Sequence, residues 1–167
     1  MQSILRLSLT VFVLMLASHA SAQAPAGGTR EFKDLLKSFP SKAFLKLRGN
    51  TKLETAAAMS KDITVKEVNK ESTFKIKVGK VDSWPFANEN ITGWRVHCMD
   101  EKVKQGSLNI TVSAWAYVRA DPDGVLKNIR PGKEIIVSGI LTRADLTAVA
   151  EPVLNIDMRV SSLKAGK

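Results

Sequence analysis

Residues 108–118, LNITVSAWAYV, decide the fold of this chain. Their side chains alternate between apolar and more polar or aromatic types along the whole stretch. A period of two is typical of a β-strand that buries one face in a core and turns the other outward. The inward set is Leu108, Ile110, Val112, Ala114, Ala116 and Val118, and the outward set is Asn109, Thr111, Ser113, Trp115, Tyr117 and, just beyond, Arg119.

Four other segments show strand patterns: residues 73–84 (TFKIKVGKVDSW), 93–99 (GWRVHCM), 134–146 (EIIVSGILTRADL) and 153–163 (VLNIDMRVSSL). Gly79 interrupts the first of them, which predicts a bulge in a bent strand. Residues 83–93 (SWPFANENITG) are rich in turn formers and are expected to form a long loop. The predicted fold class is therefore mainly β, a five-stranded small barrel, because closure removes exposed strand edges.

The first third of the chain after residue 22 has a helical pattern instead. Apolar side chains recur at spacings of three and four between Phe32 and Phe39, and Pro40 cannot continue a helix. Residues 51–61 (TKLETAAAMSK) are rich in good helix formers and predict a second helix. A short N-terminal helical segment is therefore expected before the barrel.

The strand pattern resembles the OB-fold over roughly residues 72–164. The resemblance rests on the first three strands together with RPGKEIIVSGIL (130–141) and PVLNIDMRVSSL (152–163), which look like the fourth and fifth strands of nucleic-acid-binding OB domains and their secreted bacterial relatives. It implies an OB-like barrel. OB-folds often bind oligonucleotides or oligosaccharides on the face of strands two and three. The fold alone does not give the function, because it hosts many unrelated ligands.

The N-terminus has the three parts of a secretory signal peptide. Arg6 precedes an apolar run over residues 7–17, and Ala20 and Ala22 flank Ser21 as a small-residue cleavage site. This pattern predicts cleavage after Ala22, with Ala24 as a near alternative, and a periplasmic or secreted protein. A buried N-terminal helix or an uncleaved anchor is the competing interpretation. The predicted division is a signal peptide at 1–22, a spacer and helical segment at 23–62, and an OB-like barrel at 63–167, with no later transmembrane segment.

Composition excludes several classes of site. Cys98 is the only cysteine, so an intramolecular disulfide and a multi-cysteine metal site are both ruled out. The only histidine after the leader is His97, and no catalytic motif surrounds it. No enzyme activity, cofactor or metal is therefore predicted. The formal charge of +9 favours anionic partners, although it also serves solubility alone.

The outward positions of the first three strands form the candidate binding face. Two aromatic rings two residues apart, beside several cations, suit stacking and charge recognition. The candidate ligand-binding residues are Lys75, Lys77, Arg95, His97, Trp115, Tyr117 and Arg119. In the competing interpretation, the N-terminal segment covers Trp115 and Tyr117. Trp84 and Phe86 form a second candidate in the expected loop, where they would clasp a ligand or plug the end of the barrel.

These features rank three functions. The preferred interpretation is an exported, non-enzymatic module for an anionic polymer, a glycan or an envelope protein. The first alternative is a single-stranded nucleic-acid-binding protein, which the fold resemblance favours and the leader disfavours. The last is an enzyme with an unrecognised site.

Overall fold

The computed structural model describes residues 28–166, so the predicted signal peptide at 1–22 lies outside the described residues. Four short or medium helices come first: η1 (Phe32–Ser38), α1 (Ser41–Leu45), η2 (Lys46–Arg48) and α2 (Lys52–Glu67). Six strands follow: β1 (Glu71–Phe86), β2 (Ile91–Cys98), β3 (Glu101–Gln105), β4 (Leu108–Val118), β5 (Glu134–Thr147) and β6 (Val153–Ala165). The predicted division of the chain at residue 62 stays a prediction, and α2 crosses it.

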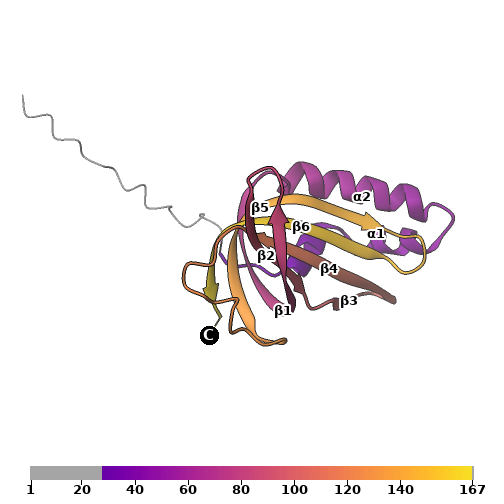
Figure 1. Ribbon diagram of the computed structural model, residues 1–167. Helices are drawn as coiled ribbons and strands as arrows, with labels where there is room; N and C mark the ends of the chain where they lie inside the picture. The colour runs from indigo at the N-terminus through magenta and orange to yellow at the C-terminus, as the bar shows by residue number, and fades with distance from the viewer. Residues whose placement is uncertain (1–27, 167) are drawn as a thin grey trace, which may run out of the picture.

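Five of the strands close into a ring (Figure 1). Its order is β2-β1-β5-β6-β4, and the additional pairing of β2 with β4 closes it. All pairings are antiparallel except β4 with β6, which run parallel. A five-stranded Greek-key barrel with this strand order is the OB-fold. The mainly β, OB-like barrel predicted from the sequence is therefore confirmed.

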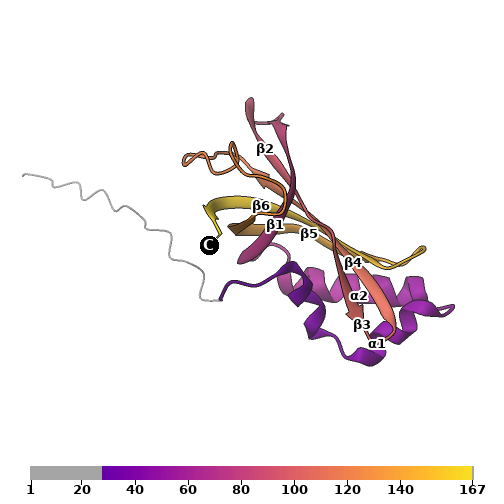
Figure 2. The same ribbon diagram turned by 90° about the horizontal axis from the view of Figure 1, so that it is seen from below.

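The ring has two additions that the sequence pattern did not predict. Strand β3 is a sixth strand that pairs antiparallel with β4 outside the ring. The expected long loop at 83–93 is wrong, because β1 and β2 continue as a paired hairpin from Ser83↔Trp94 to Phe86↔Ile91. Only residues 87–90 form the turn. The tip of this hairpin projects from the barrel on the side away from α1 and α2 (Figure 2).

The predicted bulge at Gly79 is confirmed, and it decides which side chains of β1 face outward. The register shifts between Val78, which pairs with Cys98, and Lys80, which pairs with His97. Before the bulge the buried residues of β1 are Phe74, Ile76 and Val78. After it the even-numbered positions face outward instead, so they lie beside the outward residues of β2.

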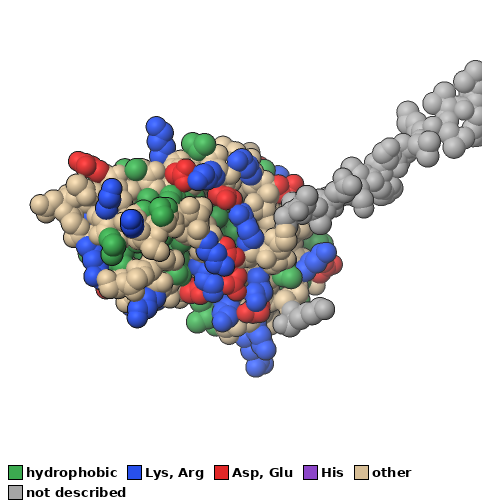
Figure 3. Space-filling model, turned by 180° about the vertical axis from the view of Figure 1, so that it is seen from behind, with side chains coloured by type: hydrophobic (Ala, Val, Ile, Leu, Met, Phe, Trp, Pro, Cys, Tyr) green, Lys and Arg blue, Asp and Glu red, His purple; other side chains and the backbone are tan. Residues whose placement is uncertain are grey.

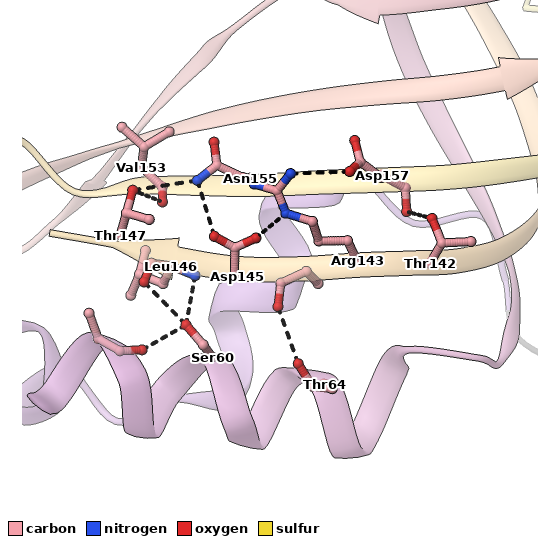
Figure 4. A network of polar contacts seen from close by, with 12 residues as sticks. Ser60, Thr64, Thr142, Arg143, Asp145, Leu146, Thr147, Val153, Asn155 and Asp157 are labelled. Atoms are coloured by element: carbon pink, nitrogen blue, oxygen red, sulfur yellow. Dashed lines mark hydrogen bonds and ion pairs between the residues drawn. The ribbon is translucent and has the colours of Figure 1, made fainter. Parts of the chain in front are cut away.

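The N-terminal helices share one core with the barrel. Phe32 stacks on Phe74 with ring centroids 4.5 Å apart, and both side chains are buried. On α2, Ser60 Oγ accepts a hydrogen bond from the backbone N–H of Leu146 at 2.8 Å, which fixes the helix to β5 (Figure 4). Arg30, which precedes η1, forms an ion pair at 2.7 Å with Glu67, the last residue of α2. The helices therefore pack on the core side of the strands.

Cys98 lies in this core at 5% exposure. Burial, and secondarily Asp100, raises the pKa of its thiol to about 12, so it is an inert apolar side chain at neutral pH. Within residues 28–166, no helix is long and apolar enough to cross a membrane.

Candidate functional site

Five side chains stack side by side on the outer face of β1, β2 and β4. We call them the aromatic–arginine array: His97, Trp115, Arg95, Trp84 and Tyr117. The His97 and Trp115 rings stack with centroids 4.3 Å apart and an interplanar angle of 28°. The Arg95 guanidinium carbon lies 4.5 Å from the Trp115 centroid and 4.4 Å from the Trp84 centroid. Trp84 then meets Tyr117 edge to face, with centroids 5.5 Å apart.

The register of three strands produces this array. Cross-strand partners on β2 and β4 are His97 with Trp115 and Arg95 with Tyr117, so each aromatic ring of β4 stands beside a cation or an imidazole. β1 pairs with the other edge of β2, and the β1 residues that face outward opposite β2 are Lys80, Asp82 and Trp84. Trp84 pairs with Gly93, whose missing side chain leaves room for the Val118 carbonyl oxygen of β4 and for the Phe86 ring. Directly opposed residues on one face of a sheet are close enough to stack.

One carboxylate beside the array, that of Asp82, pairs with Arg95 of the array and with the neighbouring Lys80. Asp82 Oδ1 lies 2.8 Å from the Lys80 ammonium, and Asp82 Oδ2 lies 3.5 Å from Arg95. The hydrogen bond from Lys80, followed by the weaker one from Arg95, keeps the pKa of Asp82 below its usual value. Burial, reinforced by the Asp157 carboxylate, raises the pKa of Tyr117, so its hydroxyl stays protonated and can donate a hydrogen bond.

A polar network on β5 and β6 borders the array (Figure 4). Asp157 on β6 is the cross-strand partner of Trp115. Arg143 donates to Asp157 at 3.3 Å and also pairs with Asp145, which in turn accepts from Asn155 at 3.4 Å. The outer face therefore offers hydrogen-bonding groups directly beside the stacked rings.

Four of the seven predicted binding residues belong to the array: Arg95, His97, Trp115 and Tyr117. Lys75 and Lys77 do not, and the prediction that they share this face is corrected. They precede the Gly79 bulge, where β1 pairs with β5, and they line a separate cavity of about 260 Å³. There the Lys75 ammonium lies 3.7 Å from both Glu31 and Glu134.

Arg119 continues the outward row of β4 but makes an ion pair with Glu89 in the β1–β2 turn. It lines a neighbouring groove of about 740 Å³ together with Ile91, Arg159 and Lys164. Trp84 and Phe86 lie on a strand rather than in the expected loop, and Trp84 does not plug the barrel. The sequence analysis placed Trp84 in a loop and therefore did not assign it to this face; the strand in fact continues, and the bulge at Gly79 shifts the alternation of β1 so that Trp84 faces outward.

Trp115 and Tyr117 are partly exposed. The N-terminal apolar side chains that were a possible cover for them, including Phe32, Leu36 and Phe44, are buried in the shared core instead. The array therefore stays open at the surface of residues 28–166.

No cluster of three or more metal-binding side chains occurs within the described residues. Basic side chains are spread over the face shown in Figure 3, and acidic ones lie among them. On this face the basic side chains are therefore dispersed among acidic ones.

Comparison with protein-family models and with curated proteins gives no match. Solved structures give matches of low similarity. A small single-stranded DNA-binding protein from Streptomyces coelicolor is 14% identical, with a TM-score of 0.37 over 58% of this chain and 94% of that one. A mitochondrial single-stranded DNA-binding protein from S. cerevisiae is 15% identical, with a TM-score of 0.36 over 59% and 97%. The second OB-fold domain of replication protein A from Methanococcus maripaludis is 13% identical, with a TM-score of 0.30 over 59% and 86%.

The preference for an exported module that binds an anionic polymer, a glycan or an envelope protein is corrected by this comparison. Two of these three structures are named as single-stranded DNA-binding proteins, and none is named as a protein of the preferred class. The fold itself follows from the strand order and the parallel β4–β6 pairing described above. This chain is an OB-fold domain with an N-terminal helical extension packed into its core.

Proposed function

We propose that this chain binds single-stranded nucleic acid on the outer face of β1, β2 and β4, without catalysing a reaction. The aromatic–arginine array carries the proposal. Unstacked bases are recognised by stacking on aromatic side chains and on arginine guanidinium planes, and the array supplies both in one continuous row. The solved structures of single-stranded DNA-binding proteins that resemble this chain are consistent with such a ligand.

Charges at the edge of the array suit the phosphates of the same strand. The side chain of Lys80 is 70% exposed although it pairs with Asp82, so its ammonium can exchange the carboxylate for a phosphate. Arg119 and Arg159 lie at the other end, beside the 740 Å³ groove. A strand that crosses β1, β2 and β4 would then meet cations at both ends and rings in the middle.

Replacing Trp115 with alanine should weaken binding of a fluorescein-labelled oligothymidylate roughly tenfold or more, because stacking on one aromatic side chain contributes about 1–3 kcal/mol. Fluorescence anisotropy at low salt measures this affinity.

Lys80→Ala should make the negative slope of log K against log salt less steep by about 0.7, as expected for one lost phosphate contact on a single strand.

Lys61→Ala is the matched control, because Lys61 is an exposed lysine on α2, far from the array in sequence and on a helix that packs on β5. Its affinity and salt slope should equal those of the unchanged protein. The proposal is wrong if the unchanged protein does not bind single-stranded DNA or RNA at low salt, or if Trp115→Ala binds as well as Lys61→Ala.

Export is part of the proposal, and the leader sequence supports it. Residues 7–17 form a short apolar run before the small-residue site at Ala20–Ala22. N-terminal sequencing of the protein from its native cells should therefore begin at Gln23. A chain that retains Met1 would contradict export and would leave the ligand among cytoplasmic nucleic acids.

A further inference from the structure

Arg95 fills the space between two indole rings. Its guanidinium carbon lies 4.4 Å from the Trp84 centroid and 4.5 Å from the Trp115 centroid, over both ring faces. Aromatic rings stack at similar centroid spacings, from about 4.5 Å upward. A planar base could therefore take the position that the planar guanidinium now occupies, with one indole on each side.

Few polar contacts hold Arg95 in this position. Among the residues that the structure describes, its one ion pair is with Asp82, at 3.5 Å, and Asp82 also has the closer Lys80 as a partner. Arg95 Nε is buried and has no hydrogen-bond partner within residues 28–166. A buried donor without an acceptor is unfavourable, so movement of the side chain toward an acceptor outside would satisfy it. The side chain is 29% exposed and already reaches the surface.

We propose that Arg95 is the placeholder of a base-binding slot between Trp84 and Trp115. One nucleobase stacks between the two indoles, and the displaced guanidinium pairs with a phosphate of the same strand. Arginine suits this exchange because its planar fork stacks on aromatic rings and also binds phosphate through two hydrogen bonds. The inference rests on the proposed function and adds the position of one base and the movement of one side chain.

The slot predicts an unusual result for a variant that removes a cation. Arg95→Ala should bind adenosine, which has no phosphate, about tenfold more tightly than the unchanged protein, because the guanidinium no longer competes for the slot. The same variant should bind oligothymidylate with a reduced salt slope, because one phosphate contact is lost. If Arg95 were only a structural part of the stack, its removal would leave adenosine binding unchanged or weaker.

The indole N–H signals in two-dimensional ¹H–¹⁵N NMR spectra measure the adenosine affinity residue by residue. The signals of Trp84 and Trp115 should shift on titration. Trp94 is an internal control, because it packs against the core on the opposite face of β2. Equal shifts at all three tryptophans, or none, would overturn the slot.

Arg95→Lys guards against collapse of the two indoles into the empty slot. It retains the charge and most of the side-chain length but lacks the planar head, so adenosine affinity should lie between those of Arg95→Ala and the unchanged protein. An affinity at or below that of the unchanged protein in both variants overturns the slot. Oligothymidylate binding by the unchanged protein tests the proposed function separately, so it can succeed while the slot fails.

Discussion

Phe74→Ala should lower the free energy of unfolding by about 3–5 kcal/mol, the loss typical of a buried phenylalanine truncated in a packed core. Phe74 is fully buried, and its ring contacts that of Phe32 at a centroid distance of 4.5 Å. Arg30 also lies over the ring at 5.2 Å, and its backbone pairs with β1 at this residue. The substitution would therefore loosen both the barrel and the attachment of the N-terminal helices.

Urea denaturation followed by circular dichroism measures this loss. Leu53→Ala is the matched control, because Leu53 is a large apolar residue on α2 that is 58% exposed. Its unfolding free energy should change by no more than about 0.5 kcal/mol. A loss below about 1 kcal/mol for Phe74→Ala would show that the N-terminal segment and the barrel do not share a single core.

Gly93→Ala should impair both stability and nucleic-acid binding, because it opens the ring where β2 meets β4. A β-carbon at this position would lie 2.3 Å from the carbonyl oxygen of Val118 and 2.8 Å from the Phe86 ring. The backbone oxygen cannot move without separating the strands, so we expect a loss of about 1–3 kcal/mol. The same separation would move Trp84 and Arg95 away from Trp115 and weaken oligothymidylate binding.

Gly49→Ala is the control for this substitution. Gly49 has a φ of −88°, and nothing lies within 4 Å of an added β-carbon there. Thermal unfolding and anisotropy should give the same values for Gly49→Ala as for the unchanged protein. Normal oligothymidylate affinity in a folded Gly93→Ala protein would contradict the dependence of the array on closure of the ring.

The sequence correctly predicted those strands of the barrel in which buried and outward residues alternate without interruption. β4 keeps a period of two from Leu108 to Val118, so its buried and outward faces could be assigned residue by residue. The signal failed at residues 83–86, where Pro85 and the following asparagines resemble a loop. The structure accommodates Pro85 near the end of the β1–β2 hairpin, where a missing N–H is tolerated.

The array itself depends on information that a single strand does not carry. Gly79 was identified as a bulge, but its consequence is a shift of alternation that moves Lys80 and Trp84 to the outer face. The two halves of β1 also have different partners, β5 for the first and β2 for the second. Which cations meet which rings follows from these long-range pairings, and no local pattern predicts them.

The position of β6 between β4 and β5 has a consequence for how the chain acquires its structure. β6 is the last of the six described strands in chain order, yet the ring contains no hydrogen-bonded pairing between β4 and β5. Until residues 153–165 arrive, the earlier strands can form hairpins but no closed barrel. Closure of the barrel must therefore wait for pairings distant in sequence, which are slow to form, and during that interval β4 and β5 expose unpaired backbone edges and apolar faces.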